Sequence, residues 1–150
     1  MTAASGGTGS RHRAREAAFQ MLYQWEVGRV EPEAALATHW TIEQDEARPL
    51  PASARRFAEQ LAIGTIGHLP EIDALLTKHA QNWRLERMAI VDRLILRLAV
   101  YELLHVPETS AAVVIDEAIE LARTFSEDEA VRFVNGVLDA VHKNLPGPGK

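Results

Sequence analysis

Apolar residues recur at every third or fourth position along most of this chain, which is the spacing of one face of an α-helix. No segment sustains the alternation of apolar and polar residues that a half-buried strand requires. The one β-like run, at residues 113–115, passes directly into a helical pattern. The sequence therefore predicts an all-α fold of about seven helices.

Residues 85–105 form the most apolar of the helical segments. Their apolar side chains cover more than one helix face, because Ile90, Leu96 and Val100 add to the main stripe. We therefore expect a central helix that is packed on several sides.

Capping residues mark where the last two helices begin. Pro107 ends the central helix, and Thr109 or Ser110 can cap the helix that follows. Ser126 and Glu129 match the Ser-x-x-Glu pattern of a capping box, so we expect Ser126 to cap the last helix.

Turn-forming residues divide the chain into parts. Residues 1–9 are rich in glycine, serine, threonine and alanine and are expected to form a disordered tail. Ser10 is a candidate N-cap for the first helix, and Gly28 suits the C′ position at its end. Residues 79–84 look like a joint. The predicted parts are an N-terminal helical subdomain at residues 10–80, a C-terminal helical subdomain at residues 81–145 and a tail at residues 146–150.

The sequence lacks the features of several protein classes. It has no P-loop, no Rossmann glycine pattern, no His-Glu-x-x-His and no Gly-x-Ser-x-Gly motif. It has no cysteine, and none of its six histidines lies three or four positions from another, so we expect neither a metal site nor a cofactor. No apolar run approaches the roughly 20 residues that span a bilayer, and there is no signal peptide. We therefore expect a non-enzymatic, cytoplasmic protein without a membrane partner.

The first predicted helix opens with a cluster of basic side chains. Arg11, His12, Arg13 and Arg15 lie close together, although the net charge of the chain is −5. Cationic side chains at this end oppose the helix dipole, so a polyanion is a natural partner for them. A solvated basic tail would explain the run equally well. Any binding of nucleic acid must therefore use a local patch rather than bulk positive charge.

Aromatic residues lie near basic residues at two places. Tyr23 is off the main apolar stripe of the first helix and could stack on an RNA base. Arg132 and Phe133, near the start of the last helix, could form a second wall of an RNA groove. The alternative is that Phe133 lies in the core and that Gly136 lets two helices approach closely.

Four segments of the chain form a specific series. They read RHRAREAAFQMLYQWEVG, LILRLAVYELL, IDEAIELARTF and FVNGVLDAV. In this order and spacing they resemble the NusB family of bacterial transcription antitermination factors. The resemblance implies an all-helical, non-enzymatic protein of two roughly perpendicular bundles. It also implies a pairing with the ribosomal protein NusE, and some members of the family form homodimers. The NusB–NusE pair binds single-stranded boxA RNA, notably in ribosomal RNA leaders, and helps the RNA polymerase antitermination complex resist termination.

The resemblance also assigns roles to individual residues. It implies that the RNA-binding residues are Arg11, His12, Arg13, Arg15, Tyr23, Arg132 and Phe133. The residues that would meet the ribosomal-protein partner are Asp92, Arg97 and Glu102. The family pattern has glycine where this chain has Ser126. Three further residues depart from it in charge, since the family has arginine, lysine and asparagine in place of His12, Ala112 and Asp116. Because each of these three departures makes the surface less positive at neutral pH, we expect RNA affinity to be lower or to depend more on the partner.

Two other functions are compatible with the same sequence. One is the RNA-binding accessory domain of an RNA cytosine methyltransferase, but the chain ends at Lys150 and has no cysteine for the methyl-transfer nucleophile. The other is a helical protein-interaction module or homodimer in which RNA binding is lost or depends on a partner. The arginines at the start of the first helix argue against such a loss, whereas His12 and Ala112 leave it open.

Overall fold

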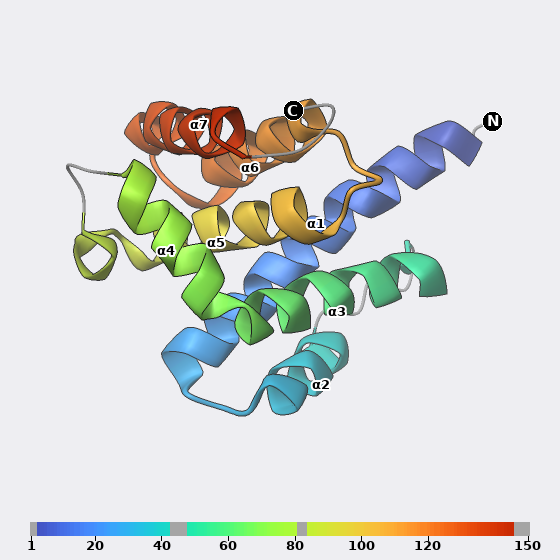
Figure 1. Cartoon of the computed structure of the whole chain (residues 1–150). Coiled ribbons are helices and arrows are strands. Elements are labelled where there is room, and N and C mark those ends of the chain that lie inside the picture. Colours follow the sequence, from blue (N-terminus) through green and yellow to red (C-terminus); the bar gives the residue numbers. More distant parts are fainter. Residues whose placement is uncertain (1–2, 43–47, 81–83, 146–150) are drawn as a thin grey trace. The chain divides into compact units, whose positions relative to one another are not determined.

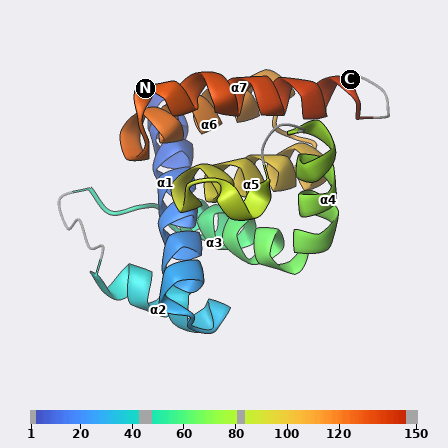
Figure 2. The ribbon, with the colours of Figure 1, turned by 90° about the vertical axis from the view of Figure 1, so that its left-hand side faces the viewer.

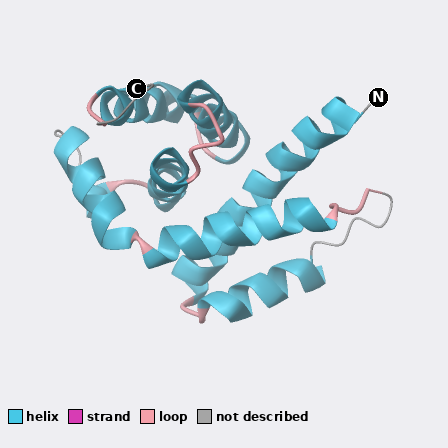
Figure 3. Cartoon of the chain, turned by 45° about the vertical axis from the view of Figure 1, so that its right-hand side comes forward, coloured by secondary structure: helices cyan, strands magenta, loops and turns pink. Residues whose placement is uncertain are grey.

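A computed structural model describes residues 3–42, 48–80 and 84–145 of the chain (Figure 1). These residues form seven α-helices and one short 3-10 helix, with no strand among them (Figure 3). The predicted all-α fold is therefore confirmed. None of the helices described is both long enough and apolar enough to cross a membrane. The elements are α1 (Ala3–Gly28), α2 (Pro32–Ile42), α3 (Ala52–Gly67), α4 (Leu69–His79), the 3-10 helix η1 (Leu85–Arg87), α5 (Ile90–His105), α6 (Ala111–Phe125) and α7 (Asp128–Lys143).

The chain divides into two compact units. The first unit ends at Ile66, and the second begins at Gly67. This division differs from the boundary that we expected at residues 80 and 81, because α4 packs on α5 and α7 and so belongs with the second unit. Residues 81–83 of the expected joint and the expected tail at 146–150 lie outside the described residues.

In the first unit, the apolar stripe of α1 forms the centre of the core. α2 packs against α1, and α3 contributes a row of buried apolar side chains. The buried residues of this core include Ala14, Ala18, Met21 and Leu22 of α1 and Phe57, Ala58, Leu61 and Ala62 of α3. Trp25, which has the same helical spacing as these apolar residues of α1, is only half-buried.

The first helix begins earlier than the sequence predicted. Residues 3–9, which we expected to form a disordered tail, continue α1, so Ser10 lies inside the helix and is not its N-cap. Each glycine costs a helix about 1 kcal/mol relative to alanine but does not prevent it. The segment also contains no proline, which would be a stronger barrier. Residues 1 and 2 lie outside the part of the chain that the structure describes.

The end of α1 is formed by an arginine in a left-handed backbone conformation. Arg29 has a φ of 55°, and its N–H donates to the carbonyl oxygen of Trp25 with an N–O distance of 3.0 Å. Glycine is favoured at such a position because it has no Cβ to clash with the backbone. Gly28, which we expected to fill it, is instead the last residue of the helix.

We predict that Arg29→Gly raises the free energy of unfolding by about 0.5–1 kcal/mol, because it removes the Cβ strain of the left-handed conformation. Urea unfolding of the whole chain measures this change. Arg123→Gly, at an exposed position inside α6, is the matched control and should instead lower stability by about 1 kcal/mol. A loss of stability in the Arg29 variant would contradict the prediction.

In the second unit, α5 is the central helix, as predicted. α4, α6 and α7 all pack on it, and α6 and α7 also pack on each other (Figure 2). Burial on several faces requires apolar residues around most of the helix circumference. The buried residues of α5 are Leu94, Ile95, Leu96, Leu98, Ala99, Val100, Tyr101 and Glu102.

One of the two predicted caps in this unit is confirmed, and the other is wrong. The Ser110 hydroxyl accepts a hydrogen bond from the Val113 N–H, with an N–O distance of 3.3 Å, at the start of α6. The capping box predicted at Ser126 does not form, because Ser126 still belongs to the end of α6 and the next helix begins only at Asp128. The Ser126 hydroxyl donates instead to the Asp92 carboxylate of α5, at 2.6 Å.

Candidate nucleic-acid interface

Two arginines of α1 lie over the same aromatic ring of α3. The guanidinium carbon of Arg11 is 3.9 Å from the centre of the Phe57 ring, and that of Arg15 is 5.3 Å from it. Residues four apart share a helix face, so the sequence spacing explains why both arginines reach one ring. The attraction between a cation and an aromatic face contributes about 0.5–1 kcal/mol at an exposed site.

The two stacked arginines differ in their access to solvent. Arg11 is exposed, and a guanidinium stacked by its face keeps N–H groups at its edge that can bind a phosphate. Arg15 is only 5% exposed and belongs to the core between the helices. The geometry therefore suits Arg11 for contact with an anion and gives Arg15 a structural role, whereas RNA binding by Arg15 stays a prediction.

Arg13 adds a further cation to this part of α1. Its guanidinium donates a hydrogen bond to the backbone carbonyl of Arg48, and the Arg48 side chain is itself exposed. We call Arg11, Arg13 and Arg48 the basic cluster. Arg48 could not be found from the sequence, because nothing in the pattern around this residue shows that it lies beside α1.

His12 and Tyr23 lie on another face of α1. They are eleven residues apart, which is about three helical turns, and so they face the same way. His12 Nε2 is 3.2 Å from the Glu16 carboxylate, which adds negative charge to this face. Tyr23 is 41% exposed, as its position off the apolar stripe predicted, and its ring centre is 6.3 Å from that of Phe19. The face thus offers an aromatic ring but little positive charge.

The middle of α7 presents polar residues to solvent. Arg132, Asn135 and Gly136 are exposed, and Phe133 is half-buried. A Cβ added at Gly136 would meet no atom within 4 Å. The alternative in which Gly136 allows close helix packing is therefore wrong. An exposed glycine inside a helix costs about 1 kcal/mol relative to alanine without any gain in packing, which favours a role in contact with a partner molecule.

We predict that Gly136→Ala raises the free energy of unfolding by about 1 kcal/mol, because the added methyl group meets open space. Urea unfolding of the whole chain measures this change in the free energy of unfolding. Gly67→Ala is the matched control, since it is equally open but lies at the end of α3, and its effect should be smaller. Destabilisation by Gly136→Ala would show that the position is not open.

Of the three residues expected to meet a protein partner, two are held by hydrogen bonds within the second unit and the third is buried. Arg97 donates two hydrogen bonds to the Asp73 carboxylate of α4, with N–O distances of 2.9 and 2.8 Å. Asp92 accepts the hydrogen bond from Ser126, and Glu102 is only 2% exposed. Arg97 and Asp92 thus tie α5 to its neighbours. Their part in a protein interface stays a prediction.

The two departures from the family pattern in α6 lie on its surface. Ala112 and Asp116 are both exposed, and their spacing places them on one face of the helix. A lysine at position 112 would therefore have reached solvent. These substitutions change the surface charge of α6 rather than its packing.

Comparison with known proteins identifies the relatives of this chain. The sequence profile of the NusB family matches residues 12–143. The chain is 47% identical over 139 residues to a transcription antitermination protein NusB of Solibacter usitatus, covering 93% of this chain and 92% of that protein. It is 43% identical over 143 residues to the NusB protein of Koribacter versatilis, covering 95% of each chain.

Solved structures of NusB proteins have a similar fold. The fold is similar to that of T. maritima NusB, with a TM-score of 0.80, 36% identity, and coverage of 89% of this chain and 91% of that one. It is also similar to a chain from a crystal structure of the antitermination factors NusB and NusE in complex with double-stranded RNA. That match has a TM-score of 0.80, 29% identity, and coverage of 91% of this chain and 98% of that one.

Proposed function

Because the chain belongs to the NusB family, we propose that it is an RNA-binding transcription antitermination factor that acts with the ribosomal protein NusE. Its ligand is a boxA-type single-stranded RNA, and its outcome is processive transcription of ribosomal RNA operons by the RNA polymerase antitermination complex. The chain performs no catalytic step in this role, which it carries out in the bacterial cytoplasm. The similar crystal structure of NusB and NusE with RNA supports both partners.

The basic cluster is the observation that carries this proposal. Arg11 is stacked on Phe57 and Arg13 is bonded to the Arg48 carbonyl, so both guanidinium groups are held in place before RNA arrives. A side chain that is already ordered loses less conformational entropy when it binds. The cluster also concentrates positive charge on a chain whose net charge is −5. This arrangement suits a phosphate backbone, which is recognised mainly by charge.

Aromatic residues would add base contacts to these phosphate contacts. Tyr23 is exposed enough to stack on an unpaired base, and such stacking is worth about 1–3 kcal/mol per base. In the second unit, Arg132 and Phe133 of α7 would supply further RNA contacts. In this proposal NusE contributes further RNA contacts, so affinity rises when the partner is present.

A second candidate function is a protein-interaction module or homodimer whose RNA binding is lost or depends on the partner. The observation that favours it is the contact between His12 and Glu16, at a position where the family has arginine. Together with the burial of Arg15, it leaves fewer cations for RNA than the sequence suggested.

The first test compares RNA binding by the wild type and by Arg11→Ala/Arg13→Ala, using a fluorescent boxA-type RNA in the presence of NusE. We predict that the double variant binds more weakly and that its log–log salt dependence becomes shallower by roughly 0.7 for each phosphate that these arginines neutralise. Arg87→Ala/Arg123→Ala removes two exposed arginines of the second unit and is the matched control. It should leave the slope unchanged.

Two further measurements separate a loss of RNA contacts from a loss of structure or of charge. Far-ultraviolet circular dichroism checks that the variants keep their helices, and Arg11→Lys keeps the charge while losing the planar group that stacks on Phe57. If Arg11→Ala/Arg13→Ala binds RNA with the affinity and salt slope of the wild type, the basic cluster is not the RNA site. If the wild type with NusE binds a scrambled RNA equally well, recognition of boxA is excluded.

At His12, where the family pattern has arginine, we predict a substitution that strengthens RNA binding instead of weakening it. His12→Arg should strengthen RNA binding and steepen the salt slope by roughly 0.7, because arginine stays charged at neutral pH. The same titration measures this gain. His79→Arg adds the same charge at the end of α4 and is the control. No gain from His12→Arg would place this position outside the RNA contact.

A further inference from the structure

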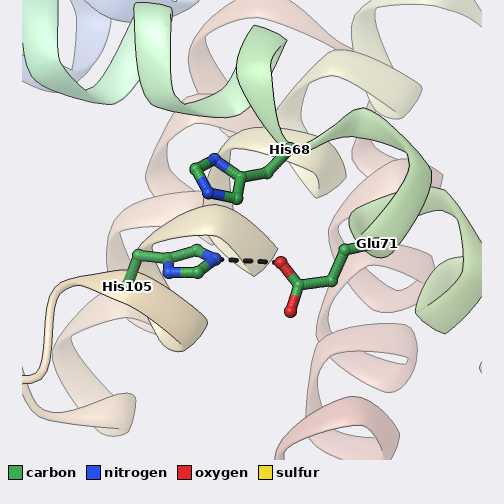
Figure 4. A group of neighbouring side chains, drawn as sticks. All are labelled: His68, Glu71 and His105. Carbon is green, nitrogen blue, oxygen red and sulfur yellow. Dashed lines mark hydrogen bonds and ion pairs between the residues drawn. The ribbon is translucent and has the colours of Figure 1, made fainter.

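Three potential metal ligands meet in the second unit, where the start of α4 lies beside the end of α5. They are His68, which precedes α4, Glu71 in the first turn of α4, and His105, the last residue of α5 (Figure 4). One donor atom of each side chain lies within 4.8 Å of the other two. His105 Nε2 is 2.9 Å from Glu71 Oε1, the contact drawn as a dashed line in Figure 4.

The packing around the group restricts how these side chains can move. The rings of His68 and His105 have centres 4.2 Å apart and are inclined by 39°. The buried Tyr101 ring lies 5.6 Å from His68 and 5.2 Å from His105, measured between ring centres. Tyr101 thus forms one wall of the group and keeps the two imidazoles together.

The other side of the group remains open to water. The side chains of His105 and Glu71 are 32% and 51% exposed. A metal ion can therefore reach the three donors, and water can complete its coordination. This accessibility distinguishes the group from a buried histidine–carboxylate contact that serves only to satisfy polar atoms.

The nitrogen and oxygen donors of the three side chains indicate which metal ions would bind. Two imidazole nitrogens and one carboxylate oxygen suit zinc and related transition-metal ions, whereas calcium and magnesium prefer oxygen donors alone. Metal–ligand bonds of about 2.0–2.2 Å in a tetrahedral site place donor atoms about 3.3 Å apart. The present separations, from 2.9 Å to at most 4.8 Å, bracket this value. Small rotations of exposed side chains would bring all three donors into range.

We propose that His68, Glu71 and His105 bind a single divalent transition-metal ion of the zinc type, with water in the remaining coordination positions. The bound ion would fasten the first turn of α4 to the last residue of α5 and so stabilise the second unit. This site is separate from the basic cluster of the first unit and does not depend on RNA binding. The sequence predicted no metal site because no two histidines lie three or four positions apart, whereas His68 and His105 meet only through helix packing.

Isothermal titration of the full-length chain with Zn²⁺, without a histidine tag, tests the site. The wild type should bind one ion per chain, and His68→Ala/His105→Ala should lose at least about tenfold in affinity. Even the loss of a group that only orients a ligand typically costs about 10–100-fold. His12→Ala/His79→Ala is the matched control, because it removes two other histidines, one of which also contacts a glutamate. The control should bind like the wild type.

Two independent measurements distinguish the loss of a metal ligand from a change in folding. Glu71→Gln keeps the size of the side chain but replaces a charged ligand by a weak one, so its affinity should also fall. Nitrogen-15 spectra of the imidazoles should show Zn²⁺-dependent shifts at His68 and His105 but not at His79. The proposal is overturned if the wild type shows no saturable binding, or if His68→Ala/His105→Ala binds Zn²⁺ as tightly as the wild type does.

Discussion

The second unit depends on the burial of α5 by three neighbouring helices. Because α4, α6 and α7 all pack on it, the polar groups of α5 must find partners on those neighbours. Arg97 does so with Asp73 of α4, and Asp92 accepts the Ser126 hydroxyl at the end of α6. These contacts fix how the helices meet, and the same packing of α4 on α5 brings His105 to Glu71.

In the first unit, one aromatic ring organises two of the three arginines near the middle of α1. Phe57 holds the stacked guanidinium groups of Arg11 and Arg15, while Arg13 is turned toward the loop that carries Arg48. Repulsion between nearby arginines would otherwise spread them apart in solution. The protein thus presents ordered positive charge on an acidic chain, which is the property that a salt-sensitive interaction with RNA needs.

The sequence was sufficient for features that depend on local spacing. Helical periodicity predicted the all-α fold, the central helix and the exposure of Tyr23. It could not show which side chains meet across helices, because periodicity defines a face but not its neighbour. For that reason the burial of Arg15, the contact of Ser126 with α5, and the meeting of His68 with His105 appeared only in the folded chain. The roles of individual residues in RNA binding remain predictions. The fold shows which of these residues are exposed and which are buried.

The most direct test of the account is to map the RNA site on the chain by nuclear magnetic resonance. Backbone amide and arginine side-chain signals of the labelled chain, bound to unlabelled NusE, would be followed while boxA-type RNA is added. We predict that shifts concentrate at Arg11, Arg13 and Arg48, also occur at Tyr23 and at residues 132–133 of α7, and weaken as salt is raised. Shifts that avoid Arg11 and Arg13, or no change on adding RNA, would contradict this prediction.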